Sequence, residues 1–353
     1  MPVSILIFTL LTCVLAQEPQ VIAVDNAAQL EQLTVIPTDI PDPVYALATS
    51  ADGQLLAAGI GSSLILWDIS TLTAPVELAR LEILGEGASD IAFANAGNLL
   101  VVGDWSGRLH VVRLENPSNP SLLTSFQAHS EYALPVAFSP DDSLLVSFGV
   151  TSFNSYIPNI HIWDVEALIR DSQTITDFYQ PARRILATGY GTVHFEDTSN
   201  DDDVQGTLIY GSEAQTITVK TFDDNLNPKV IDAFTSEFDF VDPVSISSDG
   251  RYVVAVEDSE DNSVLSVWDV TAGDQLATFA SQGSGLASIN PAGTIVAEGG
   301  YDGVLYVWDA RSGDVLARFT PSDISIEIVS FSREGRVLVS GDGEGILRFW
   351  AHP

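Results

Sequence analysis

A short strand-like phrase recurs along this chain and restricts its fold more than any other feature. It reads LILWDI at 64–69, IHIWDV at 160–165, LSVWDV at 265–270, LYVWDA at 305–310 and LRFWAH at 347–352. LHVVRL at 109–114 and ITVKTF at 217–222 are copies without the tryptophan. The five tryptophans in equivalent places are Trp67, Trp163, Trp268, Trp308 and Trp350. The last two intervals are 40 and 42 residues, a period typical of repeat proteins whose units bury their apolar faces against one another.

A tight turn precedes the phrase in six of the seven units. The turns are SADG (50–53), ANAG (94–97), SPDD (139–142), SSDG (247–250), NPAG (290–293) and SREG (332–335). Their Asn, Asp, Pro and Gly residues supply the backbone angles that a hairpin needs. The fourth unit has the acidic stretch EDTSNDDDVQG (196–206) instead. Between turn and phrase lies a run such as LLVVG (99–103), apolar on both faces, which is typical of a strand covered on both sides.

Together these motifs resemble the WD-repeat family, and specifically an exported member of bacterial type. The Trp-Asp pair, the turn and the period agree over seven units, and the resemblance covers residues 27–353. It implies an all-β, seven-bladed β-propeller of four-stranded antiparallel blades. It also implies a non-catalytic scaffold that binds proteins or peptides through loops on a rigid ring. His129, Ser147 and Trp163 match three members of the family's buried network, and Asp302 and Trp308 match two in another unit.

The first residues of the predicted ring resemble a strand that belongs to its last unit. The seventh unit stops at LRFWAHP, directly after its third strand, whereas AAQLEQLTVI (27–36) resembles an outer strand. In that alignment Leu30 and Leu33 match Leu78 and Leu81. We therefore expect residues 27–36 to complete the last blade and close the ring.

The amino terminus, MPVSILIFTLLTCVLAQ, has an apolar run from Val3 to Ala16 and a small-residue cleavage signal before Gln17. We expect a signal peptide over residues 1–16, a short leader over 17–26, and a secreted or cell-envelope protein. Lipidation of Cys13 is the alternative. Neither this run nor any later segment has the apolar length of a transmembrane helix. Cleavage after Ala16 would remove the single cysteine, so that no disulfide could form.

The composition limits the partners. Hydrophobic residues make up 46% of the 353 residues, enough for a large core. The formal charge is −34, from 14 Lys+Arg and 48 Asp+Glu, and such a field repels nucleic acid and anionic membranes. The acidity is typical of a soluble protein or a salty medium, and it also suits a cationic partner or bound divalent ions.

Turns between the second and third strands carry the candidate binding residues. The family places these turns on one face of the disc, and several combine aromatic residues with carboxylates, which suits a cationic or carbohydrate partner. The alternative is that Asp and Gly merely form the turns and that aromatic side chains cap the blade edges. The candidates are Trp105, Phe153, Tyr156, Tyr301, Asp302, Asp342 and Glu344.

Two alternative functions have weaker support from the sequence. His194 takes a place that other units give to Ala or Ser, and Glu196 and Asp197 follow it, so a metal-dependent enzyme or hydrolase could use the central channel. The acidic runs 200–203 and 257–262 suggest calcium, and with it a calcium-stabilised adhesion module, although their spacing fits no helix-loop-helix calcium site. The further weak metal candidates are Asp201, Asp203, Asp258 and Asp261.

Overall fold

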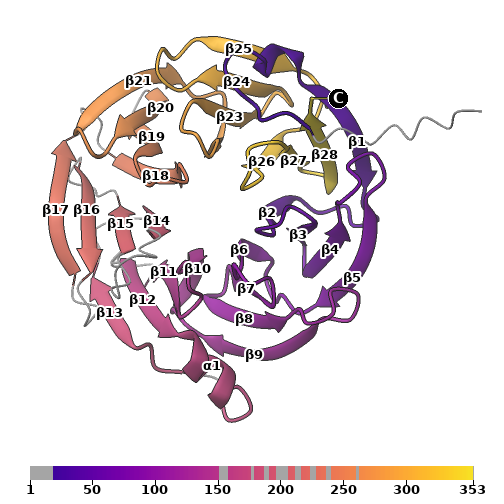
Figure 1. Ribbon diagram of the computed structural model, residues 1–353, viewed down its shortest axis with the longest axis vertical. Coiled ribbons are helices and arrows are strands. Elements are labelled where there is room, and N and C mark those ends of the chain that lie inside the picture. The colour runs from indigo at the N-terminus through magenta and orange to yellow at the C-terminus, as the bar shows by residue number, and fades with distance from the viewer. Residues whose placement is uncertain are drawn as a thin grey trace, which may run out of the picture.

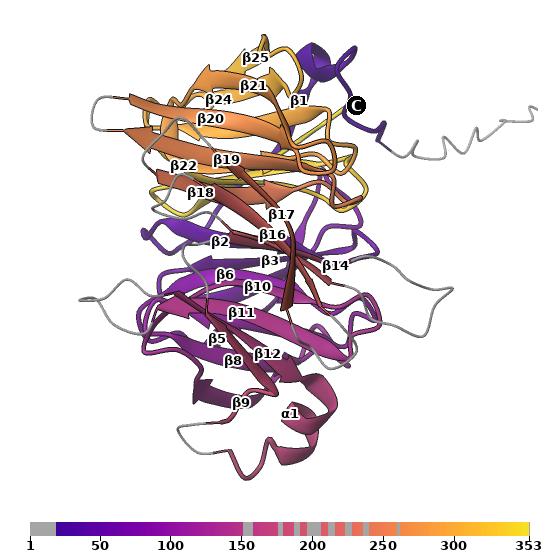
Figure 2. The ribbon, with the colours of Figure 1, turned by 90° about the vertical axis from the view of Figure 1, so that its left-hand side faces the viewer.

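A computed structural model describes residues 19–150, 158–175, 179–186, 191–195, 206–210, 216–222, 228–235, 240–259 and 262–352. These residues form an almost entirely β ring around an open centre (Figure 1). From the side, the ring is a thick disc whose strands cross it from face to face (Figure 2). In the described residues the helical elements are η1 (Ala27–Gln29) and α1 (Val165–Asp171), and α1 lies outside the ring.

The strands fall into seven four-stranded antiparallel sheets, each running from an inner to an outer strand. The first three are β2 (Val44–Thr49), β3 (Leu55–Ile60), β4 (Ser63–Asp68) and β5 (Val76–Glu82); β6 (Ala88–Phe93), β7 (Leu99–Asp104), β8 (Arg108–Arg113) and β9 (Ser121–Gln127); and β10 (Glu131–Phe138), β11 (Leu144–Val150), β12 (Pro158–Asp164) and β13 (Arg183–Leu186). The fourth and fifth are β14 (Gly191–Phe195), β15 (Gly206–Tyr210), β16 (Thr216–Phe222) and β17 (Pro228–Thr235); and β18 (Phe240–Ile246), β19 (Tyr252–Ser259), β20 (Asn262–Asp269) and β21 (Asp274–Ala280). The sixth is β22 (Gly283–Ile289), β23 (Ile295–Gly300), β24 (Leu305–Asp309) and β25 (Val315–Phe319), and the last is β26 (Ile326–Phe331), β27 (Leu338–Asp342), β28 (Ile346–Ala351) and β1 (Glu31–Pro37).

The β-propeller and its four-stranded antiparallel blades are confirmed. Strand pairing defines seven four-stranded sheets, six of which are recognised as propeller blades. Even the fourth sheet has three hydrogen-bonded ladders of defined register.

The last sheet is completed from the start of the chain, as expected, but the predicted strand was misplaced. The strand β1 pairs antiparallel with β28, while Ala27–Gln29 form the 3-10 turn η1 instead of strand. The matching of leucines was also wrong by three residues. Ile36 lies opposite Leu347 as Leu81 lies opposite Leu64, so Leu33 and Ile36 are the equivalents of Leu78 and Leu81.

A bulge in the outer strand accounts for the spacing of the apolar pair that recurs in the sequence. The register of β1 shifts between Gln32 and Thr34, leaving Leu33 outside the ladder, and the register of β5 skips Leu78 in the same way. The equivalent bulge residues in other sheets are Leu123, Ile231, Leu276 and Leu316. An extra residue bends the strand and increases its twist, which suits the curved rim of a ring. The recurring apolar pair in the sequence is therefore a bulge residue followed by a strand residue.

Residues 19–26, expected as a leader outside the ring, are packed onto it. Ile22 is fully buried within the core of the last two sheets. Its N–H donates to the carbonyl of Gly335 at 2.8 Å, and its carbonyl accepts from the side chain of Asn290 at 3.1 Å. The ring therefore begins before residue 27.

The five repeated tryptophans are all at most 6% exposed and lie between neighbouring sheets. In the third sheet the predicted network is confirmed: Trp163 Nε1 donates to Ser147 Oγ at 2.9 Å, and that oxygen lies 2.7 Å from His129 Nε2. Trp350 Nε1 donates in the same way to Ser340 Oγ at 3.0 Å. Among the described residues there is no helix with the length and apolar character of a membrane span.

Candidate binding surface

The connections between strands lie on two opposite faces of the ring. The turn-motif face carries the turn between first and second strands and the connection between third and fourth, which are residues 50–54 and 69–75 in the first sheet. The crossover face carries the turn between second and third strands and the crossing to the next sheet, which are residues 61–62 and 83–87 there. This alternation follows from antiparallel pairing, because each strand reverses direction.

On the crossover face, nine described connections form one continuous band, which we call the acidic arc. They are residues 281–282, 301–304, 320–325, 343–345, 38–43, 61–62, 83–87, 105–107 and 128–130. Hydrogen bonds join neighbouring connections: Tyr301 N to Gln282 O at 3.2 Å, Gly343 N to Ser325 O at 3.1 Å, Thr38 Oγ1 to Gly345 O at 2.7 Å, Leu84 N to Ser62 O at 3.1 Å, Trp105 N to Gly87 O at 3.2 Å and His129 N to Gly107 O at 2.9 Å. The arc spans the sixth, last, first and second sheets and reaches the third.

Glycines allow these connections to approach so closely. Gly345 has φ +79°, and a β-carbon there would clash with the carbonyl oxygen of Ile40. Gly303, at φ +74°, would likewise clash with Ser322 O. A side chain at either position is excluded both by the backbone angle and by the neighbouring connection. The arc is therefore a rigid surface rather than a row of independent loops.

Carboxylates without cations distinguish the arc. Its connections hold six exposed acids and, in the described residues, no Lys or Arg. The acids are Asp39, Asp42, Glu86, Asp302, Asp323 and Glu344. The described connections of the turn-motif face contain five arginines among nine acids. Arg80 of β5, which lies outside these connections, bonds Asp39 at 2.7 Å.

The structure brings four sequence candidates onto the arc. Tyr301 is 67% exposed, and Asp302 and Glu344 are exposed. Trp105 is half-buried and meets Tyr45 of β2 edge to face, with ring centroids 6.0 Å apart. The sequence analysis did not identify Tyr45, because this residue lies on an inner strand and not on a turn. Phe153 and Tyr156 lie outside the described residues.

Asp342 does not belong to this surface. Its carboxylate is fully buried and accepts from Arg348 at 2.7 Å, while its other oxygen accepts from the N–H groups of Glu344 and Ile346. Asp104 takes the equivalent place in the second sheet and contacts His110 at 2.9 Å. Burial opposes ionisation of Asp104, but the contacts with His110, Ser106 and its own turn outweigh it and lower the pKa. These buried acids stabilise the turns by accepting hydrogen bonds from them. Their sequence signal is the Gly-Asp-x-x-Gly spacing at 103–107 and 341–345.

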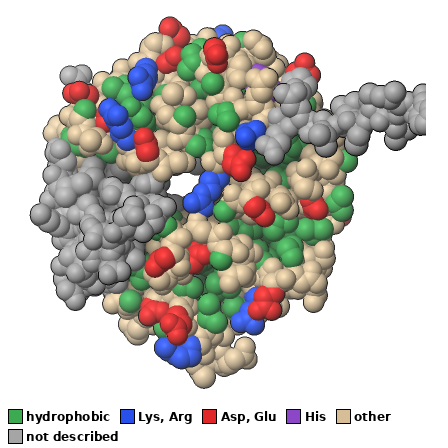
Figure 3. Space-filling view, in the orientation of Figure 1, with side chains coloured by type: hydrophobic (Ala, Val, Ile, Leu, Met, Phe, Trp, Pro, Cys, Tyr) green, Lys and Arg blue, Asp and Glu red, His purple; other side chains and the backbone are tan. Residues whose placement is uncertain are grey.

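A carboxylate also lines the inner wall of the ring between these faces. Asp90 of β6 accepts from Val136 N of the next sheet at 2.7 Å and from Ile91 N at 2.8 Å. Burial raises the pKa of Asp90 to about 6, against the lowering effect of the two N–H donors. A Lys or Arg side chain is also visible beside the central opening (Figure 3).

Most of the metal candidates lie outside the residues or side chains that the structure describes. Glu196, Asp197, Asp201, Asp203 and Asp261 lie outside the described residues. His194 and Asp258 lie on β14 and β19, where the described part of the chain includes the strands but not these two side chains. Glu257, the first residue of the second acidic run, is buried and accepts from Trp268 Nε1 at 2.8 Å, so it has a structural contact. Among the side chains that the structure describes, no group of three His, Cys, Asp or Glu could hold a metal ion.

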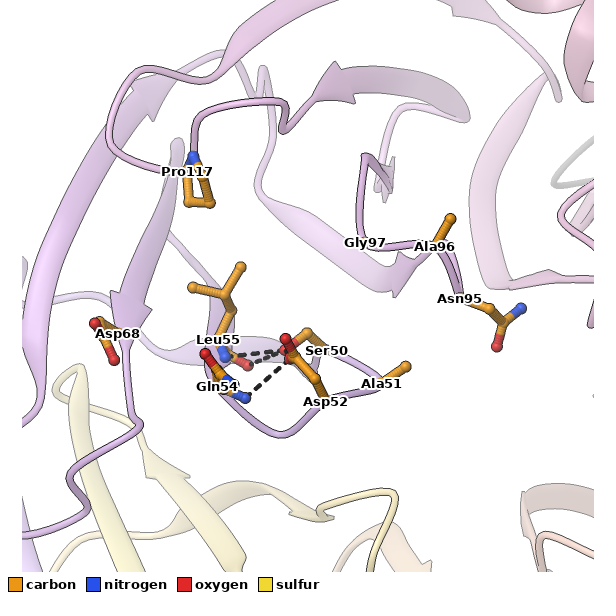
Figure 4. A pocket seen from close by; sticks show the side chains of 10 residues that line it. All are labelled: Ser50, Ala51, Asp52, Gln54, Leu55, Asp68, Asn95, Ala96, Gly97 and Pro117. Carbon is orange, nitrogen blue, oxygen red and sulfur yellow. Dashed lines mark hydrogen bonds between the residues drawn. The ribbon is translucent and has the colours of Figure 1, made fainter.

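A pocket of about 400 Å³ opens on the turn-motif face between the first two sheets (Figure 4). Its lining combines the turns 50–55 and 95–97 with Asp68 and Pro117. Asp52 Oδ1 accepts from Ser50 Oγ at 2.6 Å and from Gln54 N at 3.1 Å, which commits that oxygen to its own turn. The contact of Asp68 with Ser70 lowers the pKa of that carboxyl. The lining has no His, Cys, Lys or Arg, and its polar groups mainly shape the turns.

Comparison with known proteins does not identify a family. No protein-family model matches the chain, and no curated protein sequence matches it. The structure supports the resemblance at the level of the β-propeller.

Proposed function

We propose that this protein is an exported, non-enzymatic WD-repeat propeller of seven blades that binds a basic protein or peptide through the acidic arc. The observation that carries the proposal is the concentration of six exposed carboxylates, with no Lys or Arg, in the described connections of one band. A surface of one sign attracts a partner of the opposite sign and speeds their encounter. The apolar amino-terminal run over residues 1–16 supports export.

Rigidity makes the arc suitable for recognition. Backbone hydrogen bonds between successive connections hold the acidic side chains on a fixed frame, and the glycines at 303 and 345 keep that frame tight. A partner would then order few backbone groups on binding, so less free energy is lost to entropy. The turn-motif face lacks this charge separation, because its arginines lie among carboxylates: Arg251 bonds Asp269 at 2.7 Å, and Arg336 lies 3.3 Å from Glu334.

The test is binding of a fluorescently labelled nona-arginine peptide to the chain Gln17–Pro353, with a neutral Gly-Ser peptide as control. The arc variant neutralises four exposed acids: Asp42→Asn, Glu86→Gln, Asp302→Asn and Glu344→Gln. The matched control neutralises four exposed acids elsewhere: Glu31→Gln, Glu115→Gln, Glu166→Gln and Asp274→Asn. Both variants change the net charge equally, so they separate a local surface from the overall field.

We expect the arc variant to weaken binding roughly tenfold at low salt, because each exposed pair contributes up to about 1 kcal/mol. The control should change affinity much less. The slope of affinity against salt concentration should also fall in the arc variant alone. Equal losses in both variants would show that only net charge attracts the peptide, and would refute the arc as a site.

A further inference from the structure

We propose that Tyr45 and Trp105 form an aromatic site on the arc that receives a lysine or arginine side chain of the basic partner. This inference rests on the proposed function and names the part of the arc that selects the ligand. The two rings are nearly perpendicular, with an interplanar angle of 83° and centroids 6.0 Å apart. An ammonium or guanidinium group is attracted to the face of such rings.

A bulge directs Tyr45 toward this site. Val44 pairs with Ile60 and Ala46 with Gly59, so the residue between them has no partner in the ladder. Val44 and Ala46 are buried, whereas Tyr45 is half-buried on the inner strand. A bulge re-aims a side chain in this way, and bulges are common beside functional sites.

The crossing from the first to the second sheet holds Trp105 in place. Its N–H donates to Gly87 O at 3.2 Å. Gly87 has φ +92°, and a β-carbon there would lie 3.5 Å from Trp105 Cδ1, so the pyrrole edge of the indole lies beside this glycine. Trp105 is also the one tryptophan of the six that is not buried, since the other five serve the core. Its position on the surface is thus supported by the backbone contact with Gly87 and by packing against Tyr45.

The connections next to Trp105 carry carboxylates. A β-carbon on Gly61 would lie 2.7 Å from Asp42 Oδ2, and one on Gly87 would lie 3.2 Å from Gly61 O. The Asp42 carboxylate therefore lies next to Gly61, Gly61 lies next to Gly87, and Gly87 lies next to Trp105. Glu86, exposed, directly precedes Gly87. Ring faces combined with carboxylates suit a cation that both stacks and forms charge-assisted hydrogen bonds.

The test compares Trp105→Leu with Trp105→Phe, which keeps an aromatic face, using the labelled nona-arginine peptide. Leu122→Ala, at an exposed apolar residue of the outer strand β9 that lies outside the arc, is the control, and thermal melting checks that each variant is folded. We expect Trp105→Leu to weaken binding about three- to fivefold, the loss of one exposed cation–π contact. Trp105→Phe should retain most of the affinity, and Leu122→Ala should match the wild type.

Two further readouts separate this site from the rest of the arc. The salt dependence of binding should be unchanged in Trp105→Leu, because no carboxylate is lost, whereas neutralising the acids lowers it. The peptide should also alter tryptophan fluorescence in the wild type but not in Trp105→Leu. If the wild type binds no basic peptide, the proposed function itself fails. If it binds and Trp105→Leu binds equally well, the function stands and the aromatic site is refuted. Trp105-dependent binding of maltohexaose without binding of the basic peptide would also refute it.

Discussion

The two faces of the ring stabilise their turns by different means. On the turn-motif face, serine–aspartate pairs fix turns within their own sheets: Ser50 Oγ accepts from Leu55 N at 2.9 Å and donates to Asp52. Ser139 with Asp141 and Ser247 with Asp249 repeat this arrangement at 2.6 Å. On the crossover face, glycines let the backbone of one connection bond to the next. Side chains of the first face are thus committed to its turns. On the arc, Asp39 bonds Arg80 and Asp302 accepts from Val304 N and Tyr306 Oη, while the exposed Asp42, Glu86, Asp323 and Glu344 can reach a partner.

Charge alone therefore does not mark a binding surface in so acidic a protein. Asp342 and Glu344 lie two residues apart in one turn, yet the first is fully buried and the second is exposed. The buried acid fixes the turn and the exposed one can act on a ligand. Substitutions that remove one kind of contact at a time would test this difference.

The largest effect should come from Asp342→Ala. The substitution leaves the buried Arg348 guanidinium without its carboxylate, and we expect it to lower the free energy of unfolding by about 3 to 5 kcal/mol. Glu344→Gln, on the surface of the same turn, should change it by less than about 0.5 kcal/mol. Urea unfolding of both variants measures the difference. Similar losses would contradict the distinct roles of the two acids.

Gly345→Ala should be nearly as damaging, since it combines a positive φ with a clash against Ile40 O. We expect a loss of about 2 to 5 kcal/mol. Gly53 on the turn-motif face has φ +68° but open space where the added methyl group would lie, so Gly53→Ala should cost only about 1 to 2 kcal/mol. Thermal or urea unfolding compares them. Equal costs would show that the crossover contacts do not add to the backbone strain.

The pH dependence of stability should change in Asp90→Asn. Because the folded pKa of about 6 exceeds the ordinary value of 3.8, this carboxyl favours the folded state below pH 3.8, and the benefit is lost as pH rises through 6. The loss is on the order of 1 kcal/mol, given the partial solvent contact. Asn cannot titrate, so the stability difference between wild type and variant should shift between about pH 4 and pH 7. A constant difference over that range would refute the raised pKa.

The smallest effect concerns a single turn on the turn-motif face. Ser50→Ala removes the acceptor for Leu55 N and the donor to Asp52, and we expect a loss of about 1 kcal/mol. Peptide binding at the arc should not change, because the turn lies on the opposite face. A loss of binding would show that the two faces are coupled through the blade.

Much of the fold was predictable because the repeat carries it locally. The Trp-Asp phrases predicted the third strands, the Ser-x-Asp and Asn turns predicted the hairpins, and the contact of Trp163 with Ser147 was confirmed. The alignment of the first strand failed because Leu30/Leu33 and Leu33/Ile36 have the same spacing, and only the pairing with β28 selects the second pair. Asp342 was misassigned because the Gly-Asp-x-x-Gly spacing that it shares with the buried Asp104 was interpreted as an exposed turn. Tyr45 was missed because it lies on an inner strand, whereas the sequence candidates were chosen from turns.

The sequence by itself determined the repeating unit, the order of strands and the excess of negative charge, because each depends on residue type and spacing within about forty residues. Tertiary structure alone decided in which register the start of the chain completes the last sheet, and that residues 19–26 belong to the ring. It also decided which carboxylates reach solvent. Burial depends on what lies across the next connection, such as the backbone of Ile40 against Gly345, and that neighbour comes from the other end of the chain.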